Sequence, residues 1–190
     1  MMEAGRVIAG SARGIRLVSP GPGTRPLGDR AKQTLFAILD PDLVDARVLD
    51  LFAGSGAAGI EALSRGARYV VFVERSTAAC RVIDRNLNAT GLPLERAKVV
   101  QRDVTDYLTA ARGAAADGPF DVVLLDPPYA EGPDEALALL AEQGSIAPGG
   151  RVVAEHDARR PPADRFGPLA LADRRAFGGT GVSIYVRAPG

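Results

Sequence analysis

The feature that most constrains the fold is a regular alternation of short apolar runs and helical segments from residue 47 onward. Consecutive apolar residues predict strands buried on both faces, whereas apolar residues three and four apart predict amphipathic helices. Strands are predicted at residues 48–52, 69–74, 98–102, 120–125 and 151–155. Helices are predicted at residues 57–65, 77–89, 104–111 and 134–143. The alternation predicts an α/β, Rossmann-like fold, in which helices cover both faces of a parallel sheet.

The two ends of the chain depart from this alternation. Residues 169–177 and 182–187 are strand-like runs with no room for a helix between them, so we expect the seven-stranded, mostly parallel sheet to end in an antiparallel hairpin. At the N-terminus, residues 6–9 and 15–18 flank a turn-prone segment and predict a small β-hairpin. A helix is predicted at residues 29–39, ended by Pro41.

Length and composition predict one principal domain. The chain has 190 residues, of which 46% are apolar, enough for a single core. We expect an N-terminal β-hairpin and basic extension over residues 1–26 and a larger domain over residues 27–190. No apolar run approaches the roughly 20 residues that cross a bilayer, which favours a soluble cytoplasmic protein without a membrane partner. A single cysteine and a single histidine predict no metal site.

Charge is unevenly distributed along a chain whose net charge is zero. The first forty residues carry six Lys/Arg against three Asp/Glu, which leaves the remainder acidic. A basic arm of this kind can contact a polyanion, although a solvated surface has the same composition. The candidate contacts to nucleic-acid phosphates are Arg6, Arg13, Arg16, Arg25, Arg30 and Lys32.

A glycine-rich loop follows the first predicted strand and opens a helix. Gly54, Gly56 and Gly59 form G-x-G-x-x-G, a pattern that lets the backbone turn sharply and approach a ligand closely. Glu74 ends the second strand, 20 residues after Gly54, where a carboxylate can accept both hydroxyls of a ribose. A tight structural turn would explain the glycines alone, but together with Glu74 they predict a cofactor that contains a nucleoside.

Two cofactor classes fit this loop, and the acidic residues distinguish them. A dehydrogenase needs a proton donor such as Tyr-x-x-x-Lys, and no tyrosine here is followed by lysine at that spacing. S-adenosylmethionine has no phosphate, so its site needs carboxylates where a dinucleotide site would avoid them. Asp50 could lie near the methionine ammonium, or it could only order the loop. Asp103 could accept a hydrogen bond from the adenine amine, or it could only cap a helix. The predicted cofactor-binding residues are Asp50, Phe52, Gly54, Ser55, Gly56, Glu74, Asp103, Val104 and Asp126.

The motif Asp126-Pro127-Pro128-Tyr129 stands at the carboxyl end of the fourth predicted strand, where parallel sheets place their chemistry. The Asp126 carboxylate and the Pro127 carbonyl can both accept hydrogen bonds from an exocyclic amine and direct its lone pair at a methyl group. Tyr129 offers a surface on which a base can stack. Asp126, Pro127 and Tyr129 are therefore the predicted catalytic residues, and Pro128 and Tyr129 the predicted contacts to the substrate base.

Together these motifs resemble the RsmD family of S-adenosylmethionine-dependent methyltransferases. The residues that carry the resemblance are 6–10, 13–14, 25–26, 29–30, 34–36, 50–56, 59–67, Glu74, 86–87, Asp103 and 126–129. The resemblance implies a class I methyltransferase fold and methylation of the exocyclic N2 of a guanine in 16S (small-subunit) rRNA. It implies rRNA or the small ribosomal subunit, as an assembly intermediate or assembled, as the partner.

Two other functions remain open from the residues themselves. The same acid-proline-proline-aromatic motif serves methylation of an adenine N6 amine in RNA or DNA, although a chain this short has no room for a DNA-recognition domain. A dinucleotide-binding redox protein would use the glycine loop but leave the strand-end motif unexplained. A single domain with a free substrate face is consistent with a monomer.

Overall fold

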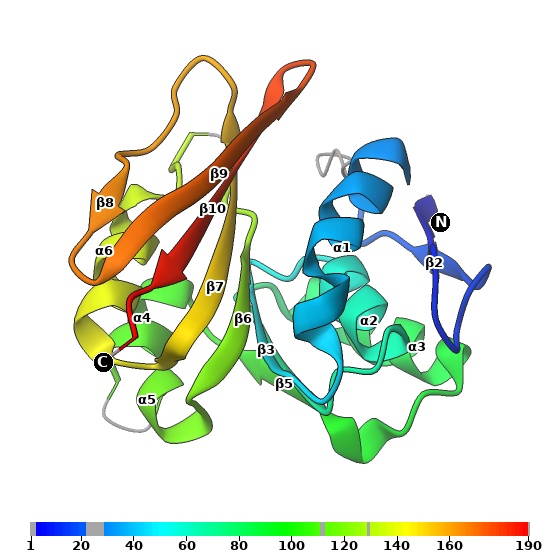
Figure 1. Ribbon diagram of the computed structural model, residues 1–190. Helices are drawn as coiled ribbons and strands as arrows, with labels where there is room; N and C mark the ends of the chain where they lie inside the picture. The colour runs from blue at the N-terminus through cyan, green and yellow to red at the C-terminus, as the bar shows by residue number, and fades with distance from the viewer. Residues whose placement is uncertain (1–2, 22–28, 111–112, 129, 190) are drawn as a thin grey trace.

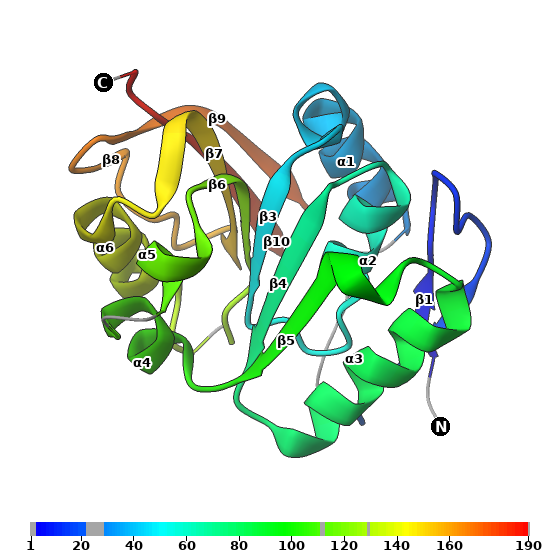
Figure 2. The same ribbon diagram turned by 90° about the horizontal axis from the view of Figure 1, so that it is seen from below.

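The computed structural model describes residues 3–21, 29–110, 113–128 and 130–189, which form one large sheet with helices on both faces and a separate two-stranded hairpin (Figures 1 and 2). The strands are β1 (Glu3–Arg6), β2 (Arg16–Val18), β3 (Arg47–Leu51), β4 (Tyr69–Glu74), β5 (Ala97–Gln101), β6 (Phe120–Leu125), β7 (Ile146–Asp157), β8 (Arg165–Phe166), β9 (Leu169–Phe177) and β10 (Thr180–Arg187). The helices are α1 (Asp29–Leu43), α2 (Ala57–Ser64), α3 (Thr77–Thr90), the 3₁₀ turn η1 (Leu94–Arg96), α4 (Val104–Thr109), α5 (Ala114–Asp117) and α6 (Asp134–Gln143).

The sheet has the strand order β5-β4-β3-β6-β7-β10-β9-β8. The first five of these strands are parallel to one another, and β10, β9 and β8 follow, each antiparallel to the strand before it. The predicted α/β fold with a C-terminal antiparallel hairpin is thus confirmed. The strand count differs, because the two residues of β8 pair with the start of β9 and make an eighth strand. A run that short has no period that a sequence pattern can reveal.

Two apolar cores lie on opposite faces of the sheet (Figure 2). One lies beneath α1, α2 and α3, and the other beneath α4, α5 and α6. The central strands β3, β4 and β6 are almost entirely buried, as expected of parallel strands covered on both sides. None of the helices in the described part of the chain has the length and apolar character that a bilayer crossing requires.

Three elements have a boundary that differs from the prediction by three residues or more. Helix α1 does not end at Pro41 but continues to Leu43. A proline in the last turn removes only one hydrogen bond, and Leu43 is fully buried in the core, which favours the extra turn. Strand β7 begins at Ile146 instead of Arg151, with a register shift against β6 that accommodates the Pro-Gly-Gly segment. The N-terminal hairpin pairs Glu3–Arg6 with Arg16–Val18, which is earlier in the chain than predicted for its first strand.

Buried polar side chains attach the N-terminal hairpin to α2 and α3. The carboxylate of Glu61, which is 1% exposed, accepts hydrogen bonds from the backbone N–H groups of Ile8 and Ala9 at 2.7 and 3.0 Å. The side-chain amide of Asn86 exchanges hydrogen bonds with both backbone groups of Val18. Apolar side chains of the hairpin also join the core beneath α1 and α2. The division of the chain at residues 26 and 27 stays a prediction.

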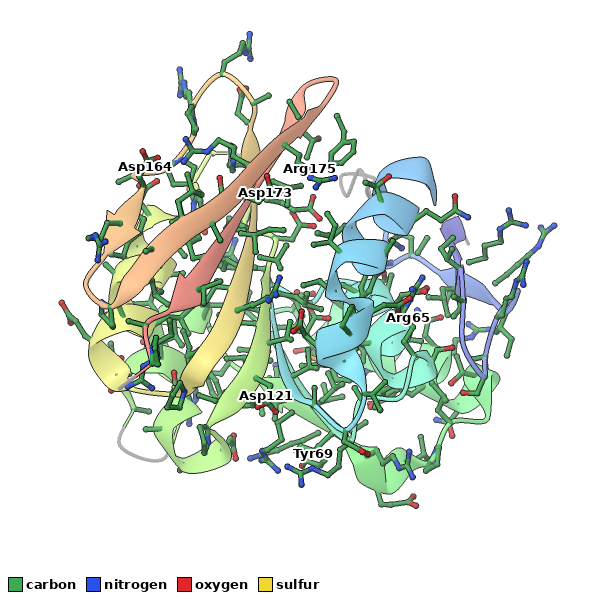
Figure 3. All side chains as sticks on the ribbon, viewed as in Figure 1. Arg65, Tyr69, Asp121, Asp164, Asp173 and Arg175 are labelled. Carbon is green, nitrogen blue, oxygen red and sulfur yellow. The ribbon has the colours of Figure 1, made fainter. Side chains whose placement is uncertain are left out.

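Ion pairs and a cation–π contact fix the helices and strands around the sheet. The Arg65 guanidinium, just after α2, pairs with Glu61 of that helix at 2.7 Å and with Asp40 of α1 at 2.8 Å, and so joins the two helices (Figure 3). At the amino ends of the strands, the Asp121 carboxylate accepts the backbone N–H of Arg47, whose guanidinium lies 5.0 Å from the Tyr69 ring centre. These contacts leave the opposite, carboxyl-terminal edge of the parallel strands open for a ligand.

Candidate functional site

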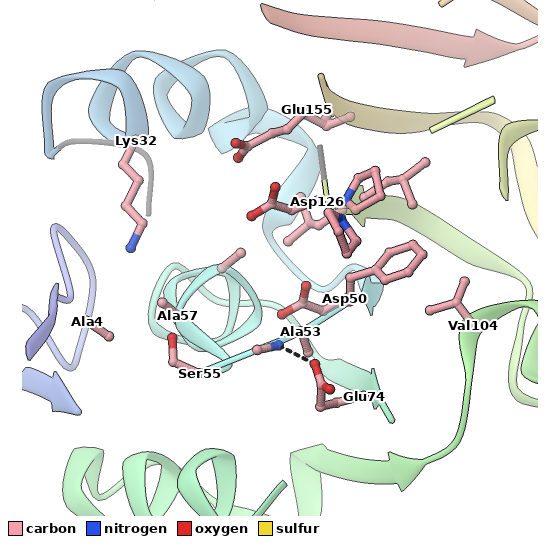
Figure 4. Close-up of a pocket in the computed structure, with 18 of the residues that line it drawn as sticks. Ala4, Lys32, Asp50, Ala53, Ser55, Ala57, Glu74, Val104, Asp126 and Glu155 are labelled. Atoms are coloured by element: carbon pink, nitrogen blue, oxygen red, sulfur yellow. Dashed lines mark hydrogen bonds between the residues drawn. The ribbon is translucent and has the colours of Figure 1, made fainter. Parts of the chain in front are cut away.

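A cavity of about 380 Å³ opens at the carboxyl ends of β3, β4, β6 and β7 (Figure 4). Its lining includes the glycine loop, the end of β4, the start of α4, the strand-end motif after β6, and residues of β7, α1 and the N-terminal hairpin. Five separate parts of the chain that carried predicted site residues therefore meet around one space. Such a volume suits a small organic cofactor together with part of a second ligand.

The glycines of the loop are required by geometry. Gly54 and Gly56 have φ of +56° and +75°, a left-handed backbone that other residues rarely adopt. A Cβ on Gly59 would lie 2.3 Å from Cε1 of Phe72 and 2.9 Å from Oδ2 of Asp50. The first two glycines thus form the turn between β3 and α2, and the third lets α2 pack closely on the strands.

Glu74 connects the end of β4 to the glycine loop. Its Oε2 accepts the backbone N–H of Gly54 at 2.9 Å, and its Oε1 accepts the backbone N–H of Ser76 at 2.8 Å (Figure 4). Each carboxylate oxygen has a further lone pair, so the same group can still accept hydroxyls of a ligand in the cavity. The two backbone bonds hold Glu74 in place for that contact.

Asp50 is a carboxyl group buried at the floor of the cavity. Its Oδ2 accepts the backbone N–H of Gly59 at 2.9 Å, so it does order the loop, and it is only 3% exposed. Burial raises the pKa of Asp50 to about 8, against the effect of the Gly59 N–H, and the Asp126 and Glu74 carboxylates raise it further. The group therefore takes up a proton near neutral pH unless a cation lies beside it.

The other predicted cofactor residues line the same cavity. Asp103 caps α4, with its Oδ1 accepting the backbone N–H of Thr105 at 2.9 Å, and its Oδ2 lies 3.7 Å from Nη1 of Arg75. Phe52 adopts a left-handed backbone, with φ of +60°, which a non-glycine residue adopts only at a cost in energy. Ser55 and Val104 also contribute to the lining. Asp103 can accept a further donor while it caps the helix.

The strand-end motif places a carboxyl group at the open side of the cavity. Asp126 is exposed to the solvent of the cavity, whereas Pro127 is buried beneath it and Pro128 is exposed. The surrounding walls raise the pKa of Asp126 to about 6, and the ammonium of Lys32 counteracts the rise. Tyr129 lies outside the described residues. The predicted location of Asp126 at a strand end agrees with the structure, and its catalytic role remains a proposal.

Three charged residues of the cavity, Lys32, Arg75 and Glu155, were not predicted to be there. Lys32 was assigned to phosphate contacts on the surface, but it is only 6% exposed and lines the cavity from α1. Figure 4 shows the carboxylates of Asp50, Asp126 and Glu155 facing the open space, with the Lys32 ammonium reaching into it from the other side. Burial and the Asp126 carboxylate raise the pKa of Glu155 well above its usual range. The strand-end rule that found Asp126 could also have found Glu155.

Three of the remaining basic candidates lie on the N-terminal hairpin. Arg6 and Arg16 are exposed and stand opposite each other in the β1–β2 pair, so they share one face of the hairpin. Arg13 is exposed in the turn, and Ala4 of the same hairpin lines the cavity. Arg25 and the side chain of Arg30 lie outside the described residues.

Comparisons with known proteins show the family of this chain. A family described as Conserved hypothetical protein 95 matches residues 5–186. The Ribosomal RNA small subunit methyltransferase D of Escherichia coli (strain K12) is 42% identical over 75% of this chain and 69% of its own. That of Haemophilus influenzae is 37% identical over 82% and 80%. The chain belongs to the RsmD family. The resemblance that the motifs predicted is thereby confirmed.

Solved structures extend the likeness of this RsmD family member to the whole fold. A hypothetical protein of Thermus thermophilus is 32% identical, with a TM-score of 0.80 over 94% of this chain and 97% of the other. An RNA methyltransferase of Salinibacter ruber, solved with S-adenosyl-L-homocysteine, shares the fold at 20% identity and a TM-score of 0.64. The predicted class I methyltransferase fold is therefore confirmed.

Proposed function

We propose that this protein transfers a methyl group from S-adenosylmethionine to the exocyclic N2 amine of a guanine in small-subunit rRNA. The observation that carries the proposal is that the Asp126 carboxylate opens into the same cavity as the glycine loop and Glu74. A methyl donor and an amine acceptor can therefore meet in one enclosed space. The names of the RsmD relatives support ribosomal RNA of the small subunit as the substrate.

The residues of the cavity fit S-adenosylmethionine, which supplies an electrophilic methyl group on a positively charged sulfonium. Glu74 can accept the ribose hydroxyls, and Asp103 can accept the adenine amine beside Val104. The buried carboxyl of Asp50 favours a cation beside it, which suits the methionine ammonium. Lys32 provides a positive charge for the methionine carboxylate, a role more consistent with its burial than a surface phosphate contact.

Asp126 and Pro127 would act on the amine. The lone pair of guanine N2 is conjugated with the ring, so hydrogen bonds to the Asp126 carboxylate and the Pro127 carbonyl help the nitrogen become pyramidal. As N2 bonds to the methyl carbon, the carbon–sulfur bond breaks and its electron pair stays on sulfur. The amine then carries the positive charge, which the Asp126 carboxylate stabilises before the proton leaves. With a pKa of about 6, Asp126 is itself a suitable acceptor for that proton.

The basic hairpin would hold the RNA while the target base enters the cavity. A base inside a duplex cannot reach Asp126, so the target is unpaired or turned out of its helix. Arg6, Arg13 and Arg16 are exposed on a hairpin of which Ala4 lines the cavity, so they can contact phosphates of the RNA strand that carries the base.

One set of measurements tests the function. Calorimetric titration should show binding of S-adenosylmethionine and no binding of NAD. Small-subunit rRNA methylated by the protein, then digested, should yield N2-methylguanine at one position. Asp126→Ala should abolish transfer while cofactor affinity changes little, and Asp134→Ala, at an exposed site on α6, should leave both unchanged. Methylated adenine in the digest would favour the N6 alternative, and substantial transfer by folded Asp126→Ala would refute the role of Asp126.

A further inference from the structure

Glu155 lies beside Asp126 on the side of the cavity away from the ribose-binding Glu74. Strands β6 and β7 are parallel neighbours with Leu125 paired to Ala154, so Asp126 and Glu155 follow at the same level, about one strand spacing apart. Both side chains line the cavity, and their carboxylates face the same open space (Figure 4). The two carboxylates therefore form a pair of hydrogen-bond acceptors at the open side of the site.

We propose that Glu155 selects the target base, with its carboxylate accepting the N1–H of guanine while Asp126 accepts the neighbouring N2 amine. The Watson–Crick edge of guanine presents these two donors side by side. Adenine presents its N6 amine next to N1, a bare acceptor, so the lone pair of that nitrogen would face the Glu155 carboxylate. A site built to pair with a donor rejects a base that lacks it. The inference rests on the proposed function and adds the residue that determines the base.

Glu155 must be ionised to distinguish guanine from adenine, because a protonated carboxyl could donate a hydrogen bond to N1 of adenine. The positive charge of Lys32, which lowers the pKa of Glu155, favours the ionised form. Burial and the Asp126 and Asp50 carboxylates outweigh this effect in the empty cavity and raise the pKa of Glu155. A ligand that brings positive charge between these groups lowers the pKa of Glu155 and favours the ionised form.

The test uses a base that keeps the N2 amine but lacks the N1 hydrogen. Once the methylated guanine has been mapped, RNA segments around it are synthesised with guanine or 2-aminopurine at that position. Wild-type protein should prefer guanine strongly in kcat/KM. Glu155→Gln has an amide that can donate to N1, so it should reduce the guanine preference by about 10- to 100-fold. Glu142→Gln, an exposed change on α6, should leave the preference unchanged.

The comparison isolates position 155, because 2-aminopurine also lacks O6 and this loss affects all variants alike. An unaltered guanine preference in active Glu155→Gln overturns the inference and leaves the proposed function standing. A second measurement needs no variant: wild-type protein should not methylate RNA with 1-methylguanine at the target, and efficient transfer would also overturn the inference. Absence of any methylated guanine in the mapping refutes the proposed function, and the inference with it.

Discussion

Replacing Asp50 by Asn should stabilise the cofactor-free protein, although it alters a residue of the candidate site. Burial raises the pKa of Asp50 from 3.8 to about 8, so at neutral pH the carboxyl must gain a proton when the chain folds. The stability associated with this group is complete below pH 3.8 and is lost as the pH rises through 8. At pH 7 the loss is about 4 kcal/mol relative to a neutral group of the same shape. The amide oxygen of Asn can still accept the Gly59 N–H.

Urea unfolding of cofactor-free protein at several pH values measures this effect. The free energy of unfolding of Asp50→Asn should exceed that of wild type by an amount that grows by about 1.4 kcal/mol per pH unit between about pH 5 and 7. Above about pH 8 the difference should level off. Asp84→Asn, at an exposed position on α3, should show no such trend. A difference that does not vary with pH, or a variant less stable at every pH, would refute the reasoning.

If Asp50 binds the methionine ammonium as proposed, the same variant should bind S-adenosylmethionine at least about tenfold more weakly, because it removes the negative charge of that pair. Wild-type binding near pH 7 should release part of a proton, as Asp50 ionises beside the ligand. Calorimetry in buffers of different ionisation enthalpy detects that release. Equal affinity of the two proteins, without proton release, would exclude a direct role of Asp50 in binding the ammonium.

Three further changes test other parts of the structure. Arg13→Glu should weaken RNA binding without changing cofactor affinity, and equal RNA retention by filter binding across salt concentrations would contradict that role. Gly59→Ala should lower the free energy of unfolding by about 2 kcal/mol or more, because its Cβ would lie 2.3 Å from the Phe72 ring, whereas Gly179→Ala has open space around it. Glu61→Ala should lower it by about 3 kcal/mol and expose the N-terminal hairpin to protease, and an unchanged digestion pattern would count against that attachment.

Much of the fold and part of the site follow from local patterns. Consecutive apolar residues identified the parallel strands, and the rule that ligands bind at the carboxyl ends of such strands identified Glu74 and Asp126. Lys32 was predicted at the surface because a charged residue in a basic segment is usually exposed to solvent. Only the packing of α1 against the sheet directs it inward. Glu155 was missed because only the apolar residues of its strand were used in the prediction, and the acidic residue at the carboxyl end was not considered as a ligand contact.

The sequence by itself determined the order of strands and helices, the glycine turn and the acidic strand ends, because these depend on residues within a few positions of one another. The tertiary structure decided which charges share the cavity. Residues 32, 50, 126 and 155 are far apart in the chain. They come close together, and their charged groups lose contact with water, only when separate elements pack together. The electrostatics of the site, and with it the chemistry available there, is therefore a property of the packed molecule.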